Sequence, residues 1–481
     1  MDADVWQTVS DDPSVTASSN RPDSPTPRPL SNWTIVAGAL VVLGVAAVIG
    51  FVLLRRYGGQ GAQIQLDAIR TAGTLVIGTG GAVALLLTAR RQRYTELTLV
   101  HTTRDATERR ITELYTKAAD QLGSEKAPVR LAGLHALERL AQNTPEQRQT
   151  IVDVICAYLR MPYTPPDEQP PAEDAPNTDT HTRYENRRQE QQVRLTAQEI
   201  LLRNLRVTAQ HRRRWWHRTP PPAPAWPGIR LNLAGAFLLK VSLAECQLGN
   251  AYFEGAQFTG ETSFKGAQFT GETSLKGAKF TGGEANFEGA RFTDGANFEG
   301  AQFTGGAFFV DTQFTGETSF LGAQFTDGEA FFLRTRFNHP TSFQGAQFTG
   351  EAYFEDAQFT GGEADFVDAQ FTHSANFVHV HFTGKIYFGS TQFSGEAYFW
   401  GAQFSGEAIF VRAQFTGGAS FQGAQFTGAA DLSKARVSSA AAEPAGVWPP
   451  GWTPRPAKPD NGEDPAFLYL TRVEEAQPPG T

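Results

Sequence analysis

The sequence predicts two apolar membrane helices and a small helical region, followed by an all-β solenoid. Three observations predict this order. Residues Trp33–Leu54 form an uncharged apolar run, apolar residues between positions 111 and 159 recur with the 3–4 spacing of helices, and large apolar residues recur every five or six positions from Leu233 to Leu432. A five-residue period fits neither an α-helix nor a flat strand, so the backbone must turn a corner in each repeat.

Composition narrows the class of protein. The chain has 481 residues and a formal net charge of −8, which argues against direct nucleic-acid binding. Its two cysteines, Cys156 and Cys246, cannot form a disulfide framework. All but two of the 36 Phe residues lie between Phe237 and Phe426, so one segment has a core built on Phe instead of an ordinary mixed core.

The N-terminal region is predicted to anchor the chain in a membrane. Residues 1–30 are rich in Ser, Pro and Asp and are expected to be a disordered tail. Trp33–Leu54 would be about 33 Å long as a helix, enough to cross a bilayer. A signal peptide is the alternative, but the preceding tail is acidic and the run is long. A second apolar stretch, Thr71–Ala89, completes a hairpin over residues 31–92 with helices at about 33–54 and 71–89.

The distribution of Arg residues near the hairpin predicts its orientation. Six lie outside the hairpin, namely Arg21, Arg28, Arg90, Arg91, Arg93 and Arg104. Three lie in the connecting loop, namely Arg55, Arg56 and Arg70. Because cytoplasmic flanks are enriched in basic residues, both termini are expected in the cytoplasm of a two-helix membrane protein.

The segments between hairpin and repeat are predicted to be mostly helical. A helical domain is expected over 93–161, a Pro-rich acidic linker over 162–182 and a basic helix over 183–218. The basic helix ends in a run of five residues that combines positive charge with indole rings: Arg212, Arg213, Arg214, Trp215 and Trp216. This run either contacts an anionic membrane surface or, through its Trp residues, covers the first coil near Leu233.

The repeat itself resembles a known family. A small residue lies two positions before nearly every large one, as Ala256 precedes Phe258, and this pattern resembles the pentapeptide-repeat proteins. The resemblance implies a right-handed quadrilateral β-helix over 229–436, with both residue types pointing inward. Four repeats per turn would give about nine coils and a rod about 43 Å long. Residues 437–481 read as a Pro-rich tail, whose Trp448 and Trp452 are candidates to cover the last coil.

Finer features resemble one branch of that family. An extra residue usually follows the Ala-Gln-Phe copies, which is similar to the Phe-rich branch. The apolar hairpin and the stretch DQLGSEKAPVRLAGLHALERLA resemble membrane-anchored members common in actinomycetes.

The family geometry places an aromatic strip on one face of the rod. Its outward residues would be Phe308, Phe331, Tyr353 and Tyr398, with Trp400 beside them. Such a strip suggests a docking surface for a protein. The alternative is that aromatic residues simply suit strands.

No motif in the sequence supports catalysis. There is no phosphate-binding loop, zinc-protease motif, nucleophile elbow or paired-cysteine zinc spacing, so no catalytic, cofactor-binding or metal-binding residue is expected. His373, His379 and His381 form the one cluster worth weighing for a metal, and ordinary surface positions are the preferred interpretation.

These observations predict a non-enzymatic, membrane-anchored scaffold whose rod binds a protein partner, with the lipid bilayer as its second partner. One alternative rests on charge. Between Glu284 and Asp368 there are fourteen acidic residues and three Arg, and an acidic rod resembles the DNA-mimicking family members that bind topoisomerase (gyrase). In that case the chain would be a gyrase-binding protein tethered at the membrane. The acidic residues could equally serve to keep a Phe-rich rod soluble.

Overall fold

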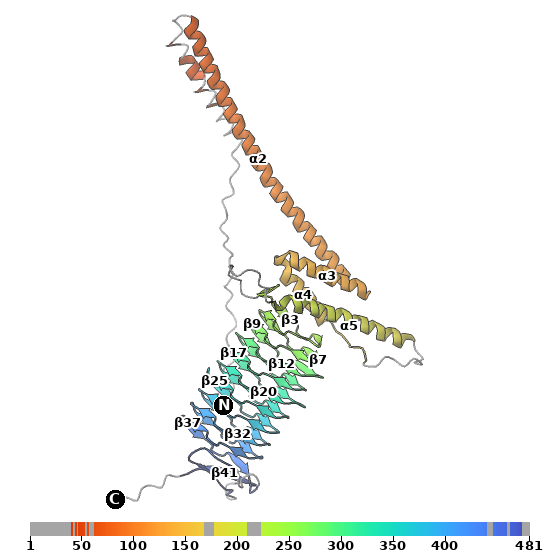
Figure 1. Ribbon diagram of the computed structural model, residues 1–481, viewed down its shortest axis with the longest axis vertical. Coiled ribbons are helices and arrows are strands. Elements are labelled where there is room, and N and C mark those ends of the chain that lie inside the picture. The colour runs from red at the N-terminus through yellow and green to blue at the C-terminus, as the bar shows by residue number, and fades with distance from the viewer. Residues whose placement is uncertain are drawn as a thin grey trace, which may run out of the picture. The chain divides into compact units, whose positions relative to one another are not determined.

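The computed structural model describes residues 40–41, 44–45, 47–52, 55–56, 62–167, 178–208, 223–439, 446–458 and 462–473 (Figure 1). The chain divides into two compact units, Met1–Arg109 and Arg110–Thr481. The tail predicted over residues 1–30 lies outside the described residues.

The first unit is helical where it is described. Thr71–Ala89 lies within helix α2 (Ala62–Leu122), which continues without a break past the boundary expected at residue 92. Much of Trp33–Leu54 lies outside the described residues. Within the described part of the chain, no helix is long and apolar enough to cross a membrane. The hairpin therefore stays a prediction.

The repeat forms a four-sided solenoid of short parallel strands. Its four sheets run from β3 (Leu231–Asn232) to β38 (Ala430–Asp431), from β4 (Phe237–Leu239) to β39 (Arg436–Ser438), from β5 (Gln247–Leu248) to β37 (Gln425–Phe426), and from β8 (Thr262–Ser263) to β36 (Ala419–Ser420). From β5 to β39, successive strands of the chain belong to successive sheets, so each complete coil contributes one strand to every face. The solenoid predicted from the five-residue period is confirmed.

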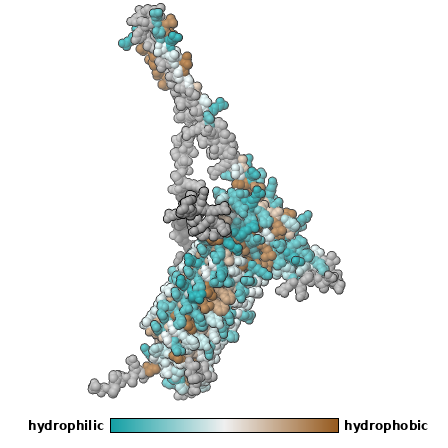
Figure 2. All heavy atoms as spheres, viewed as in Figure 1, coloured by the Kyte–Doolittle hydropathy of each residue, from teal (hydrophilic) through white to brown (hydrophobic). Residues whose placement is uncertain are grey.

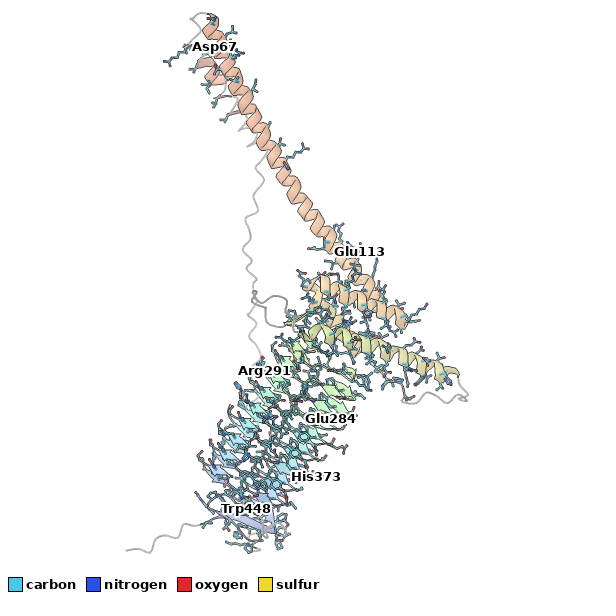
Figure 3. The ribbon with its side chains drawn as sticks, viewed as in Figure 1. Asp67, Glu113, Glu284, Arg291, His373 and Trp448 are labelled. Carbon is cyan, nitrogen blue, oxygen red and sulfur yellow. The ribbon has the colours of Figure 1, made fainter. Side chains whose placement is uncertain are left out.

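The interior of the solenoid is filled by ladders of Phe rings (Figure 3). Phe298 and Phe320 stack with ring centroids 4.6 Å apart, and Phe320 stacks on Phe343 at 4.7 Å. Rings of neighbouring ladders meet edge to face, as Phe320 does with Phe309 at 5.4 Å and with Phe332 at 5.5 Å. Because both arrangements are favourable for aromatic pairs, one residue type can fill the whole core.

Threonine replaces alanine at a few inward positions without leaving a polar group unpaired. Thr312 and Thr335 are fully buried, and each hydroxyl donates to a backbone carbonyl, that of Phe287 at 2.8 Å and that of Phe309 at 2.6 Å. The hydroxyl hydrogen bonds explain why the small inward position accepts Thr as well as Ala.

Three helices cover the N-terminal end of the solenoid: α3 (Ala127–Asn143), α4 (Arg148–Arg160, after the 3-10 turn η1, Pro145–Gln147) and α5 (Thr178–Leu205). Gln198 of α5 donates to the carbonyl oxygen of Leu239 at 3.0 Å and accepts from its N–H at 3.1 Å. Gln149 makes the same pair of bonds with Arg230, at 2.8 and 2.9 Å. Each side-chain amide thus replaces the neighbouring strand that the first coil lacks.

Apolar contacts complete this N-terminal cap. The side chains of Leu159, Leu201 and Leu202 lie against Leu233 and Leu238 of the first coil. Trp226, at the start of the repeat, is completely buried, and its backbone N–H donates to the carbonyl oxygen of Asn204. The helices and the solenoid therefore share one core, although the sequence suggested a separate helical domain and a free basic helix.

The basic helix is shorter at its end than the 183–218 expected. Helix α5 stops at Leu205 because the chain then pairs with the solenoid: Arg206 bridges Cys246, and the N–H of Val207 donates to the carbonyl oxygen of Glu245 at 2.8 Å. Strand β1 (Val207–Thr208) pairs with β2 (Ala223–Pro224). Residues 209–222 lie outside the described residues.

The C-terminal end is also covered. Strands β40 (Trp452–Pro456) and β41 (Phe467–Arg472) form an antiparallel hairpin, and β41 pairs with β39 of the last coil. Trp448 packs against Phe415, with ring centroids 5.6 Å apart, at this end of the solenoid (Figure 3). The described part of 437–481 is therefore a cap made of strands, and Trp448 and Trp452 lie at the last coils as the sequence suggested.

A buried carboxylate links α3 to α5 and makes the cap sensitive to acid. Glu138 is 6% exposed and accepts hydrogen bonds from Arg203 at 2.7 Å and from Asn204 at 2.8 Å. Burial acts to raise the pKa of Glu138, but these hydrogen bonds and the charge of Arg203 outweigh burial and hold the pKa below its usual value.

This network predicts a loss of stability in acid. A carboxylate with a depressed pKa in the folded state stabilises the fold above its ordinary pKa, and that contribution disappears as the pH falls through the folded value. We expect the melting temperature to fall as the pH drops below about 4. The Glu138→Gln variant should be less stable at pH 7 by about 1–3 kcal/mol and should lose part of this acid dependence. Thermal unfolding between pH 3 and pH 7 measures the stability at pH 7 and its acid dependence. If the variant has the same pH profile as the unmodified chain, Glu138 is not a source of the acid dependence.

Candidate interaction surface

The eight-stranded sheet presents the predicted aromatic strip in its outward ladder. Strands β16 (Ala307–Phe308), β20 (Ala330–Phe331), β24 (Ala352–Tyr353), β28 (Ala375–Asn376) and β32 (Ala397–Tyr398) pair in register. Phe308 stacks on Phe331 at 4.9 Å, and Phe331 stacks on Tyr353 at 5.0 Å. Three of the five predicted residues thus form one continuous stack.

Asn376 interrupts the strip after Tyr353. Its amide donates to the carboxylate of Glu355 at 2.5 Å. Beyond it, Tyr398 and Trp400 contact each other edge to face at 5.0 Å, and Trp400 is 44% exposed. The structure therefore separates the five predicted residues into a stack of three and a pair.

Two aliphatic side chains widen the stack of three into an apolar patch. Val310 and Leu333 follow Phe308 and Phe331 by two positions, and their coils are joined by a hydrogen bond from the N–H of Asp311 to the carbonyl oxygen of Leu333. All five side chains are partly exposed. We call Phe308, Val310, Phe331, Leu333 and Tyr353 the aromatic patch. Figure 2 shows hydrophobic side chains gathered midway along the solenoid, near the position of β20 in Figure 1.

The ring of Phe308 lies over a glycine. A Cβ atom at Gly306 would come within 2.9 Å of the Phe308 ring, so a side chain there would displace the ring. The equivalent positions one coil earlier and one coil later are Glu284 and Glu329. The glycine therefore leaves room for the Phe308 ring between two acidic positions of this row.

Carboxylates border the patch along that row. The hydroxyl of Tyr353 donates to Glu351, and this hydrogen bond, together with burial and the charges of Glu351, Glu329 and Glu355, raises the pKa of Tyr353 to about 12. Three carboxylates, those of Glu329, Glu351 and Glu355, thus lie close enough to Tyr353 to act on its hydroxyl.

The corner on the other side of the patch holds charged residues in a strained backbone conformation. Asp311, Arg334, Asp356 and His379 have φ between 53° and 55°, a region that favours glycine. Arg334 forms a bidentate pair with Asp311 at 2.7 and 2.8 Å, which holds the pKa of Asp311 below its usual value. His379 lies 3.8 Å from Asp356. The cation nearest the patch is thus already paired.

A hollow on another face was missed by the sequence analysis. It has a volume of about 460 Å³ and lies on the ten-stranded sheet. Small outward side chains, including Asn297, Ser319 and Ser342, are among the residues that line it, as are Glu317 and Glu363. A run of small outward residues on every fourth repeat was the available sequence signal.

The His cluster, the two cysteines and the Arg-Trp run are the other residues that the sequence analysis singled out. Among the residues that the structure describes, no group of three or more His, Cys, Asp or Glu side chains is placed to hold a metal ion. Burial raises the pKa of Cys246 to about 11 and that of Cys156 to about 12, so both thiols remain protonated core residues. The Arg-Trp run, Arg212 to Trp216, lies outside the described residues, and its contact with a membrane stays a prediction.

Comparison with known proteins adds one finding. The family model described as pentapeptide repeats (9 copies) matches ten overlapping windows between residues 243 and 436: 243–291, 253–302, 264–313, 287–332, 298–347, 322–370, 332–381, 366–414, 377–425 and 388–436. No curated protein and no solved structure matches the chain. The matched windows cover nearly the whole solenoid, whose inward Phe and Ala ladders follow the repeat. The solenoid is therefore built from pentapeptide repeats, and over residues 243–436 the chain is similar to the pentapeptide-repeat family.

Proposed function

We propose that this chain is a non-enzymatic scaffold that is anchored in a membrane and binds a protein partner through the aromatic patch. The observation that carries the proposal is the stack of Phe308, Phe331 and Tyr353, which is partly exposed on a solenoid that needs no outward aromatic residue for its core. Other outward positions of the same ladder hold Ser263, Asn286 and Ser420, so the fold accepts polar residues there.

Two kinds of support favour membrane anchoring. Trp33–Leu54 is apolar and uncharged over its whole length, and the Arg distribution favours cytoplasmic termini. Large apolar side chains in the described part of the first unit are also exposed, including Phe51 at 63% and Ile77 at 76%. Lipid contact would cover such side chains. Arg212–Trp216 would then add a second contact with anionic lipid on the cytoplasmic side.

Alkaline carbonate tests the anchor. We expect the full-length chain to remain in the membrane fraction after carbonate treatment, because a spanning helix inserts almost irreversibly. A chain shortened to begin at residue 93 should be released. Release of the full-length chain would contradict the anchor.

Comparison of two variants tests the docking surface. In Phe331→Ser the patch loses its central ring, whereas Gln324→Ser changes an outward residue of the twelve-stranded sheet on the same coil. We expect quantitative mass spectrometry of proteins purified with each variant to show at least one protein that is lost only with Phe331→Ser. Identical protein sets for both variants would contradict a role for the patch.

A DNA-mimicking function is the second candidate, and the acidic hollow favours it. Glu272, Glu317 and Glu363 line one face of the rod at alternate coils. A supercoiling assay with gyrase and the full-length chain separates the two candidate functions. Inhibition of supercoiling supports the DNA mimic, whereas unaffected supercoiling contradicts it and favours the scaffold.

A further inference from the structure

We propose that the aromatic patch binds a cationic amphipathic α-helix of the partner protein, with the axis of that helix along the axis of the solenoid. This inference rests on the proposed function, since it takes the patch as the docking surface, and it names the chemistry of the partner.

The spacing of the rings matches a helix. The ring centroids of Phe308, Phe331 and Tyr353 are 4.9 and 5.0 Å apart. On a helix, residues i and i+3 or i+4 lie about 5–6 Å apart, and i and i+7 lie about 10.5 Å apart along the axis. The side chains of one apolar stripe at i, i+3 or i+4, and i+7 can therefore each lie against one of the three rings.

An extended segment does not match. Side chains on one face of a strand repeat about every 6.6–6.8 Å, so they fall out of step with the rings within two residues. A strand also needs free backbone partners. The backbone groups of β16, β20 and β24 are bonded between coils, for example the N–H of Phe309 to the carbonyl oxygen of Phe331 at 2.7 Å. This face therefore offers side chains, which is what a helix requires.

The width of the patch also favours a helical partner. Val310 and Leu333 form a second apolar row beside the ring stack. Two adjacent rows can accept an apolar stripe at positions i, i+3, i+4 and i+7, which itself has two rows. The central ring, Phe331, is stacked on both of its faces, so its contact with the helix is apolar packing and not cation–π stacking.

Charge at the border selects a basic helix. Glu284, Glu329 and Glu351 line one border of the patch, and Glu355 and Asp356 lie next to Tyr353. The raised pKa of Tyr353 supports a negative potential there. Arg334 does not offset it, because it is paired with Asp311. Lysine or arginine flanking an apolar stripe complements this pattern, whereas an acidic helix would be repelled.

A designed peptide tests the chemistry. The probe is a fluorescent 18-residue peptide with Leu at i, i+3, i+4 and i+7 positions and Lys on both sides of that stripe. Full-length chain is held in phosphatidylcholine nanodiscs, and empty nanodiscs supply the background. We expect saturable binding that weakens as salt rises, because surface charge attraction is screened. A peptide with Glu in place of every Lys should show no binding above background.

Variants locate the binding. Phe331→Ser should weaken binding of the Leu-Lys peptide at least about 10-fold, as loss of a central aromatic anchor does, while Gln324→Ser should leave it unchanged within about twofold. Serine occupies this ladder naturally at Ser263 and Ser420, so the variant should fold, and its melting temperature checks this. A peptide of the same composition with Leu and Lys alternating, which favours a strand, should bind at least about 10-fold more weakly.

Each outcome decides the inference. Equal binding of the Leu-Lys peptide to Phe331→Ser, equal binding of the alternating peptide, or binding of the Glu peptide would overturn it. If the Leu-Lys peptide does not bind while Phe331→Ser still loses a copurified protein, the docking surface stands and the helical partner is wrong. If the Leu-Lys peptide does not bind and Phe331→Ser loses no copurified protein, the proposed function fails as well.

Discussion

Replacement of Phe320 by Ala is expected to lower the free energy of unfolding of the solenoid by about 3–5 kcal/mol. Its ring is completely buried and stacked between Phe298 and Phe343 at 4.6 and 4.7 Å. Truncation removes this contact on both sides and leaves a cavity between rigid coils that cannot collapse. Phe354→Ala should cost about as much, because Phe354 lies in the same setting between two stacked rings.

Chemical denaturation followed by circular dichroism measures this loss. The matched control is Gln324→Ala, an outward residue of the same coils, which should change stability by no more than about 0.5 kcal/mol. Similar losses at Phe320 and Gln324 would show that the assignment of inward and outward positions is wrong.

Replacement of Arg194 by Leu is expected to destabilise the N-terminal cap by about 3 kcal/mol. The side chain of Arg194 is 3% exposed and pairs with Glu190. It donates to the carbonyl oxygens of Leu159 and Met161 at 2.9 Å each, and its guanidinium lies 4.5 Å from the ring centroid of Tyr163. Leucine would remove the donor to two carbonyl groups at the end of α4 and one of the donors to the Glu190 carboxylate, which also accepts from Arg130 and Tyr158.

The same helix provides the control for this prediction. Arg183 is exposed and, among the described residues, pairs with Asp179, four residues away, at 3.0 Å. Arg183→Leu should therefore change stability by no more than about 0.5 kcal/mol. Thermal unfolding of both variants decides the matter. Equal melting temperatures would show that the buried network does not hold α5 against the end of α4.

The solenoid could be predicted from the sequence because residues that are close together in each repeat determine its geometry. A large residue every five or six positions, with a small residue two before it, fixes which side chains point inward in each coil. Phe258, Phe269 and Phe280 accordingly lie in the core with at most 2% exposure. Each coil contacts the next through a constant register, so one local rule determines the whole domain.

The N-terminal cap could not be predicted in the same way, because its contacts join distant parts of the chain. Gln198 and Leu239, for example, are 41 residues apart. A signal was nevertheless present. Val193, Ala197 and Ile200 follow a helical spacing in a segment that looks basic as a whole, and all three are completely buried. The count of Arg residues drew attention to the basic end of this segment, Arg212 to Trp216, and away from this apolar face.

The aromatic patch was predicted in part. The family geometry gave the outward positions, and Phe308, Phe331 and Tyr353 occupy them. Tyr398 and Trp400 were assigned to the same strip, but Asn376 separates them from it, because a ladder is continuous only where every coil contributes an aromatic residue. Sequence alone also did not show which carboxylates surround Tyr353, because they come from two successive coils.

A comparison of the four faces of one coil tests the central claim most directly. A photoreactive phenylalanine analogue is placed in the full-length chain at Gln324, Phe331, Arg336 or Ser342, each of which is an outward residue of a different sheet. The chain is then irradiated in intact cells. A docking surface at the aromatic patch predicts a discrete crosslinked product at position 331 and none at the other three. Equal products on all faces, or a product on another face alone, would contradict it.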